Sequence, residues 1–274
     1  MLSKLKYLKA LSIIKEIPTE GHSPLLILAD DYEKYYIKST KDKNPCYDIL
    51  NEFICYYLLK IWQIPVPEIA AIKVNPSLIE NRDFTQLYHK KYYYEKLTFG
   101  SLSKPKAFEM SNFFEIRGKV DFKKFINPDT IIKIGLFDIW VDNTDRKPSN
   151  NNIIFQYIND RIKIYAIDNA FTFCSMDYES LNPQYISNTF DENILETKIA
   201  KRIVFELKKE KEWINEFRKY FYFCIEQSYE NFNKIKGYIP NELGFNEELS
   251  ECLKNFLFDK ERNKKVFEEF LKRI

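Results

Sequence analysis

The strongest constraint on this chain comes from one polar loop and the segments that flank it. The loop, DNTDRKPSNNN at residues 142–152, follows an apolar run with helical spacing and precedes two short apolar segments at 152–158 and 162–167. Asp145 and Asn150 lie five residues apart in this loop, and Asp168 follows the second segment. Phosphoryl transfer needs a group that orients or deprotonates a hydroxyl, and oxygen ligands for Mg²⁺. The stretch therefore predicts phosphoryl-transfer chemistry, with an ordinary polar turn as the alternative interpretation.

The two short segments predict a β-hairpin that brings Asp168 back to the loop. If Asn159-Asp160 is a two-residue turn, Asn151 lies opposite Asp168, with their Cα atoms about 5 Å apart. A slip of one residue in the register would not change this outcome. The hairpin therefore makes Asn150 and Asp168 candidate ligands of one cation.

Composition indicates a soluble globular protein and excludes several function classes. The chain has 274 residues, 45% of them hydrophobic and 30% charged, which is enough for one large domain or two lobes. A formal charge of +2 gives little support for a dedicated nucleic-acid or membrane binder. With five scattered cysteines and two histidines, a zinc site or a His-based triad is improbable. No continuous apolar run suits a signal peptide or a membrane span, so we expect a cytoplasmic protein with reduced thiols.

The first hundred residues have a β-rich pattern interrupted by one helix. Strands are predicted at 5–17, 25–29, 35–39 and 68–74, with a fifth near 92–97 and a connector at 98–101. Lys38 lies at the end of the third strand, and Glu52 lies in the first turns of a helix predicted at 47–62. The turn at 19–24 contains Gly21, His22 and Ser23, which are candidate phosphate contacts, although an ordinary turn explains them equally well.

Helical patterns dominate the rest of the chain. The pattern turns helical from Lys104, with breaks near Gly118 and Pro128, and a strongly apolar helix from Asp129 to about Val141 should be central. Amphipathic helices are predicted at 197–209, 211–232 and 241–273, the last one broken near Phe258-Asp259. Lys on a strand, Glu on a helix, an Asp-x₄-Asn loop, a hairpin and an Asp follow the linear order of a two-lobed kinase.

Three segments resemble a known family. They are YYIKS (35–39), ILNEFICYYLLKIWQIPVPEI (49–69), and FDIWVDNTDRKPSNNNIIF (137–155) with YAIDNAF (165–171). In this order they are similar to the HipA-like kinase domain group, whose members are relatives of the HipA serine/threonine kinase toxins. That group shares its kinase-like fold with the phosphatidylinositol kinases. The resemblance covers roughly residues 15–175.

The resemblance implies an α+β, two-lobed protein-kinase-like fold. The small β-rich ATP-binding lobe would span residues 1–100, and the larger, mainly helical catalytic lobe would span residues 101–274. Lys38 would contact the ATP phosphates and Glu52 would pair with it. Phe99, in the LTFGS segment, occupies the place of the hinge that meets adenine.

The same resemblance gives roles to the loop residues. Asp145 would be the catalytic base, and Asn150 and Asp168 would be the Mg²⁺ ligands. The sequence departs from the family pattern at two places: Lys147 stands where many relatives have His, and Asn169-Ala170 follow Asp168 without the usual glycine. These departures put the positioning and the mobility of the two loops in question.

We therefore expect an ATP- and Mg²⁺-dependent phosphotransferase that acts on a hydroxyl group of a protein Ser or Thr. Two alternatives stay open at this level: a nucleotide-binding regulatory module without transfer activity, and a kinase for a small molecule. The resemblance to toxin kinases also implies that a partner protein could regulate this chain. Residues 176–274 carry no motif that identifies the phosphoryl acceptor.

Overall fold

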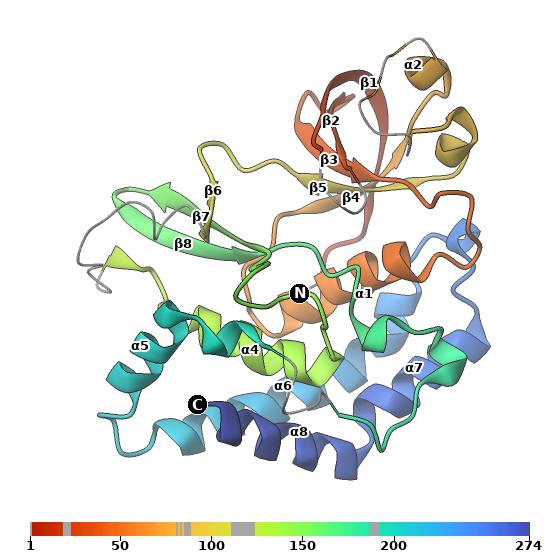
Figure 1. Ribbon diagram of the computed structural model, residues 1–274. Coiled ribbons are helices and arrows are strands. Elements are labelled where there is room, and N and C mark those ends of the chain that lie inside the picture. Colours follow the sequence, from red (N-terminus) through yellow and green to blue (C-terminus); the bar gives the residue numbers. More distant parts are fainter. Residues whose placement is uncertain are drawn as a thin grey trace.

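The chain has a mixed α+β structure. The computed structural model describes residues 2–18, 23–80, 82, 84, 89–110, 124–186 and 192–274. A β-rich N-terminal region stands above a mainly helical C-terminal part, with a long β-hairpin at their side (Figure 1). Gly21 and His22, two of the predicted phosphate contacts, lie outside the described residues.

Five strands of the N-terminal region close into a barrel with the order β1-β2-β3-β5-β4. The strands are β1 (Lys6–Glu16), β2 (Leu25–Ala29), β3 (Lys34–Lys38), β4 (Ile69–Lys73) and β5 (Thr98–Leu102). β1 pairs parallel with β4, and the other four pairs are antiparallel. Ile27, Ile37 and Ile72 fill the interior of the barrel. These alternating apolar residues explain why the strands of this region were predictable from their period-two pattern.

The predicted strand at 92–97 is wrong, and so is the predicted connector at 98–101. Residues Lys91–Tyr94 form a 3₁₀ turn, η1, and β5 occupies Thr98–Leu102. Tyr92 and Tyr93 stack edge-to-face at 4.6 Å within that turn, so aromatic content misled the strand assignment. Gly100 has no side chain, so Ile72 of β4 packs into the space that a Cβ at position 100 would occupy. The actual connector therefore follows β5 at residues 103–107.

A short strand also replaces part of the predicted helix after Lys104. β6 (Phe108–Glu109) adds to the hairpin of β7 (Ile153–Ile158) and β8 (Arg161–Ala166) in the order β6-β7-β8. Phe108 packs on Phe155 and Tyr157 of β7, and this cross-strand pairing overrides the local helical pattern. Residues 111–123, which that prediction also covered, lie outside the described residues.

The hairpin has the predicted turn and register. Ile153 pairs with Ala166 and Ile158 pairs with Arg161, so Asn159 and Asp160 form the two-residue turn. Both turn residues have positive φ, 49° and 61°, which suits Asn and Asp and the type I′ geometry of tight hairpins. Beyond the strands, the Ile167 amide donates to the Asn152 carbonyl at 3.0 Å. The chain therefore returns to the polar loop immediately before Asp168.

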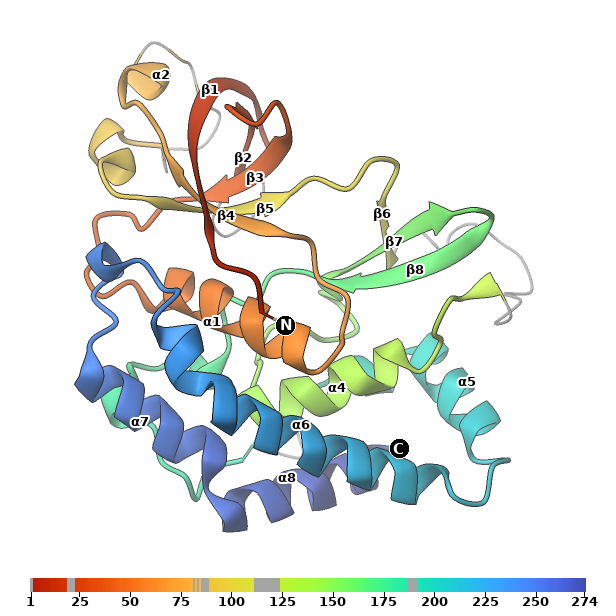
Figure 2. The ribbon, with the colours of Figure 1, turned by 180° about the vertical axis from the view of Figure 1, so that it is seen from behind.

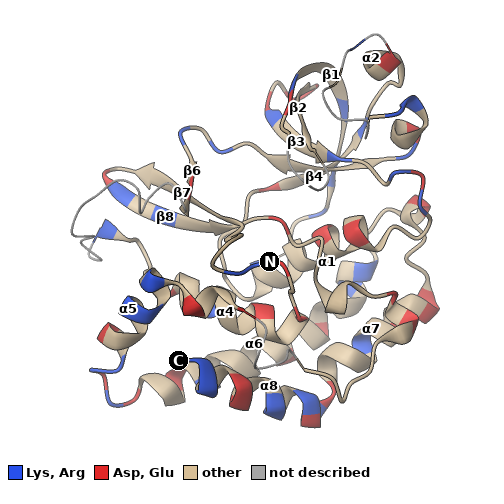
Figure 3. Ribbon diagram, viewed as in Figure 1, with Lys and Arg blue, Asp and Glu red and all other residues tan. Residues whose placement is uncertain are grey.

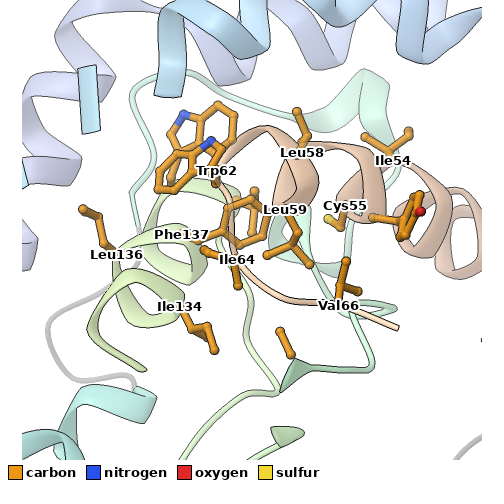
Figure 4. Close-up of a cluster of buried hydrophobic side chains, with 14 of the residues drawn as sticks. Ile54, Cys55, Leu58, Leu59, Trp62, Ile64, Val66, Ile134, Leu136 and Phe137 are labelled. Carbon is orange, nitrogen blue, oxygen red and sulfur yellow. The ribbon is translucent and has the colours of Figure 1, made fainter. Parts of the chain in front are cut away.

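Two apolar helices form the centre of the C-terminal core. They are α1 (Tyr47–Ile61) and α4 (Thr130–Val141), and most of the residues of each are buried. Trp62, just after α1, stacks on Trp140 of α4 with ring centroids 5.0 Å apart, and meets Phe137 edge-on at 5.2 Å. Figure 4 shows this packing around Trp62, Phe137 and Ile64. Glu52 and the start of the polar loop are thus built on two buried helices.

Amphipathic helices cover this centre (Figure 2). They are α5 (Lys198–Leu207), α6 (Trp213–Lys236), α7 (Glu247–Phe258) and α8 (Lys260–Arg273). The predicted break at Phe258-Asp259 is confirmed, because the Asp259 carboxylate accepts from the Arg262 amide at 2.7 Å and so caps α8. Basic and acidic residues alternate along the visible faces of α7 and α8 (Figure 3), as on solvated helices.

Short elements complete the described structure. They are α2 (Ser77–Glu80) and the 3₁₀ turns η3 (Phe173–Ser175), η4 (Tyr178–Ser180), η5 (Ile194–Glu196) and η6 (Asn241–Leu243). Within the described ranges, no helix has both the length and the apolar character needed to cross a membrane.

Candidate active site

Lys38 is the centre of a buried ion cluster between the barrel and α1. Its Nζ lies 2.7 Å from Glu52 Oε1 and 2.8 Å from Asp168 Oδ1, and the residue is 9% exposed. Burial by itself would lower the pKa of Lys38. The carboxylates of Asp168 and Glu52 outweigh burial and raise the pKa above its ordinary value. The ammonium therefore stays charged throughout the neutral range.

Glu52 connects the barrel lysine to the loop that carries Asp168. It lies in α1, is 2% exposed, and uses Oε1 for Lys38. Its second oxygen, Oε2, accepts a hydrogen bond from the Asn169 amide at 3.0 Å. The ion pair implied by the family resemblance is thus present, and both oxygens of the buried carboxylate have partners, as a buried charge requires.

Asp145 is fixed by amide groups on both of its carboxylate oxygens. Oδ1 accepts from Asn150 Nδ2 at 2.8 Å, and Oδ2 accepts from Asn152 Nδ2 at 2.9 Å. The backbone amides of residues 145 and 146 donate to Asn143 Oδ1 at 3.0 and 3.2 Å, and these bonds hold the backbone of the loop. These hydrogen bonds fix the orientation of the Asp145 carboxylate.

Asp168 sits at a backbone position that L-residues seldom adopt. Its φ is +55°, and its side chain is 34% exposed, so part of the carboxylate faces open space. Residues held in this region, particularly Asp and Asn, often occur where the chain must aim a functional group. The Asp168 carboxylate lies next to the Lys38 ammonium, in agreement with the order of these residues in the sequence.

Arg146 joins the 142–152 loop to the Asp168 loop from inside the protein. The guanidinium is fully buried, pairs with Asp138 of α4 through Nη1, and donates from Nη2 to the Ile167 carbonyl at 2.8 Å and to Asn169 Oδ1 at 2.9 Å. Burial raises the pKa of Asp138, and Arg146 opposes that rise. The contacts to the Asp168 loop explain why Asn169 fits where relatives have glycine.

Sequence reasoning missed a second buried network behind Asp168. Asn51, one residue before Glu52, donates from Nδ2 to the Ala170 carbonyl at 2.8 Å and to the Thr172 carbonyl at 3.2 Å. Its Oδ1 accepts from the Tyr178 hydroxyl at 2.6 Å. The Asn-Glu pair in α1 was the available signal: each residue holds a different part of the 168–172 loop.

Two predicted cofactor contacts occupy different surroundings. Phe99 is buried in β5 and meets Phe53 edge-on at 5.1 Å, so its ring packs on α1 within the core. Ser23, after the undescribed turn, is buried and has φ of +41°. Phe99 is the register partner of Lys38 across β3 and β5, so its backbone lies beside the Lys38 cluster.

The residues expected to hold Mg²⁺ have suitable chemistry. Asp168 presents a carboxylate that is one-third exposed. Asn150 donates to Asp145 through its amide nitrogen, which leaves its carbonyl oxygen for a hard cation. Mg²⁺ takes oxygen ligands and usually relies on one or two protein groups together with phosphates and water. The hairpin register brings both residues to the same end of β7 and β8.

Comparison with known proteins places this arrangement in a family. A profile described as HipA-like kinase matches residues 11–271. Among solved structures, the crystal structure of the proinflammatory kinase CtkA from Helicobacter pylori has a TM-score of 0.54 and 13% identity over 98% of this chain and 97% of that chain, a likeness in fold. No curated protein sequence matches. Because the profile covers nearly the whole chain, this protein belongs to the HipA-like kinase family.

Proposed function

We propose that this kinase transfers the γ-phosphoryl group of ATP, with Mg²⁺, to the hydroxyl of a protein Ser or Thr. The barrel region up to about residue 100 acts as the ATP-binding lobe, and the remainder acts as the catalytic lobe. The observation that carries the proposal is the Lys38 ammonium in contact with Glu52 and Asp168 at 2.7 and 2.8 Å. A buried cation shared by a helix and a metal-ligand loop is the phosphate clamp that kinases require.

In this proposal Lys38 binds phosphate oxygens and Glu52 sets its position. Glu52 is the better anchor because it is 2% exposed and fixed at both oxygens, whereas Asp168 is one-third exposed. When ATP binds, the ammonium keeps Glu52 and exchanges its contact with Asp168 for phosphate oxygens. Asp168 is then available as a metal ligand.

Asp145 orients the acceptor hydroxyl and accepts its proton as the hydroxyl oxygen attacks the γ-phosphorus. Asn150 and Asn152 hold the carboxylate from two sides at 2.8 and 2.9 Å. Positioning of this kind is the main contribution of a protein to phosphoryl transfer, because the transition state needs little covalent help. Asn152 is a positioning residue in this scheme.

Asn150 and Asp168 would hold Mg²⁺, which neutralises charge on the phosphates when bound. The substitution at Lys147 leaves the loop intact because its backbone, not its side chain, closes the turn: the amides of Lys147 and Asn150 donate to each other's carbonyls at 3.0 Å. The absence of glycine after Asp168 is offset by the bonds of Asn169 to Glu52 and Arg146. These contacts support an active enzyme.

The test is phosphate transfer by an Asp145→Asn variant. We expect transfer from radiolabelled ATP to protein substrates to fall by about 10²–10⁴-fold, the usual contribution of a general base, with ATP affinity nearly unchanged. Asp160→Asn is the matched control, since Asp160 lies in the exposed hairpin turn far along the strands from the loop. Equal activity of wild type and Asp145→Asn would refute the assigned base.

The same assay separates the other functions. ATP-dependent stabilisation without transfer to any acceptor would indicate a nucleotide-binding regulatory module. Transfer to a metabolite pool but not to a protein extract would indicate a small-molecule kinase.

A further inference from the structure

A pocket whose lining is strongly basic lies outside the Lys38 cluster. It has a volume of about 260 Å³ and is bordered by Lys60, Glu68, Lys104, Lys163 and Tyr165, together with residues 63–66. These residues come from the end of α1, the segment leading into β4, the connector after β5, and β8. Three stretches of the chain, residues 60–68, 104 and 163–165, therefore converge on one concave site.

The charges in this pocket are unbalanced. Glu68 is its single carboxylate, and that group is already engaged: Oε1 accepts from Lys60 Nζ at 2.9 Å, and Oε2 accepts from the Tyr56 hydroxyl. Among the described residues, Lys104 and Lys163 have no carboxylate within 4.0 Å. Three lysines and one glutamate leave a net charge of +2 in the pocket.

Lys104 and Lys163 both contact one aromatic ring. Their ammonium groups lie 5.2 and 5.1 Å from the centroid of the Tyr165 ring, and Tyr165 is 6% exposed. A cation over an aromatic face is stabilised by about 0.5–1 kcal/mol at an exposed site, which is a weak substitute for a counter-ion. Burial, and then the neighbouring Lys163 and Lys60, lower the pKa of Lys104, while Glu68 opposes this shift. The lining therefore carries uncompensated positive charge.

We propose that this pocket binds a phosphate group, outside the catalytic site. A phosphate monoester carries about −1.5 to −2 charges at neutral pH, which matches the net +2 of the pocket, whereas a carboxylate supplies only −1. Each lysine offers three N–H donors as a compact charge, suited to the three terminal oxygens of phosphate. The concave shape concentrates the positive potential where the anion would sit.

The pocket is connected to the catalytic residues through the backbone. The Pro65 carbonyl in its wall accepts from the Ala166 amide at 3.0 Å, which joins the segment after α1 to the end of β8. α1 carries Glu52, and β8 leads within two residues to Asp168. A phosphate that bridges Lys60, Lys104 and Lys163 would therefore stabilise the same two elements that hold Lys38.

The test is calorimetric titration of the full chain with inorganic phosphate, in wild type and in Lys104→Gln/Lys163→Gln. We expect the double variant to lose at least tenfold in phosphate affinity. Lys211→Gln/Lys219→Gln removes the same charge from an exposed turn and an exposed position of α6, and should bind like wild type. Phosphate bound at the catalytic site contributes to all three titrations and cancels in the comparison. Equal affinity of the two double variants, or no binding by wild type, would overturn the proposal.

Glu68→Gln provides an independent arm that adds charge instead of removing it. The variant keeps the shape of the side chain while the net charge of the pocket rises by one, so phosphate affinity should increase by severalfold; unchanged or weaker binding would count against the site. A third titration uses a phosphoserine peptide. Tighter binding of the peptide than of inorganic phosphate assigns the site to a phosphorylated side chain, and equal binding assigns it to free phosphate.

Folding of the variants is checked by their melting temperatures without ligand. Removing two neighbouring like charges should leave the melting temperature of Lys104→Gln/Lys163→Gln equal to or above that of wild type. Lost binding in a variant that still melts at the wild-type temperature then reports the pocket itself.

Discussion

Replacing Arg146 with Met should be among the most damaging single changes in the chain. Met keeps the approximate length of the side chain but removes its charge and donors. Asp138 then remains buried with only the Asn143 amide, at 3.3 Å, as a partner among the described residues, and the Ile167 carbonyl and Asn169 Oδ1 lose a donor. Removing one member of a buried ion pair costs about 3–5 kcal/mol, because the other charge is left uncompensated.

That loss is large compared with the stability of a typical domain, about 5–15 kcal/mol. At roughly 2 °C per kcal/mol for a chain of this size, the melting temperature should fall by about 6–10 °C. Urea unfolding followed by tryptophan fluorescence is a suitable assay, since Trp62, Trp140 and Trp213 are all buried. Arg202→Met is the matched control: Arg202 pairs with Glu206 on the surface of α5, and its loss should change stability by less than about 1 kcal/mol.

A second substitution tests whether the cost comes from the stranded carboxylate. Adding Asp138→Asn to Arg146→Met removes the unpaired charge, so the double variant should be more stable than Arg146→Met alone by more than about 1 kcal/mol. If the two substitutions simply add, or if Arg146→Met melts within 2 °C of wild type, the assigned role of this pair is wrong.

Three further changes test other parts of the structure. Asn51→Ala removes the hydrogen-bond partner of the Tyr178 hydroxyl and of two carbonyls in the 170–172 loop. The free energy of unfolding in urea should fall by about 2–4 kcal/mol, and ATP-dependent activity should weaken. A change below about 1 kcal/mol would contradict the network. Gly135→Ala should destabilise by about 1–3 kcal/mol despite the better helix propensity of Ala, since its Cβ would meet Leu195 Cδ2 and Cγ at 2.5 Å; a stabilised variant would show that Leu195 moves freely. Burial lowers the pKa of His89 although Glu16 opposes this, so the unfolded chain binds more protons and stability is lost as pH falls through the folded-state pKa, below about 6.5. Between about pH 7.5 and 5.5, His89→Gln should lose less stability than wild type, and parallel losses would refute the assignment.

The sequence predicts best those parts of this fold in which local chemistry and tertiary packing agree. The hairpin is an example, because Asn159 and Asp160 favour the positive φ of a tight turn and the flanking residues alternate. α4 is another, because a run so apolar has to be central. β5 was misplaced because its glycine, Gly100, is a weak strand former, and its packing against Ile72 is a tertiary contact that the local pattern does not encode.

The candidate site was predictable as a set of residues but not as a network. Lys38, Glu52 and Asp168 could be placed together from their order in the sequence. Arg146, Asn51 and Asn152 act through contacts to backbone carbonyls and to other side chains, and no spacing rule encodes such contacts. The adenine contact of Phe99 stays a prediction: its ring packs on Phe53 and its backbone pairs with Lys38.

The most direct test of the proposed phosphotransfer site is Mg²⁺-dependent binding of a non-hydrolysable ATP analogue to Asp168→Asn and Asp160→Asn. Both aspartates have positive φ, 55° and 61°, and Asn tolerates that conformation, so the two variants differ chiefly in the position of the lost charge. We predict that Mg²⁺ increases analogue affinity at least tenfold in wild type and Asp160→Asn, and has little effect in Asp168→Asn. An equal Mg²⁺ effect in all three proteins would contradict the assignment of Asp168 to the metal and, with it, the central claim.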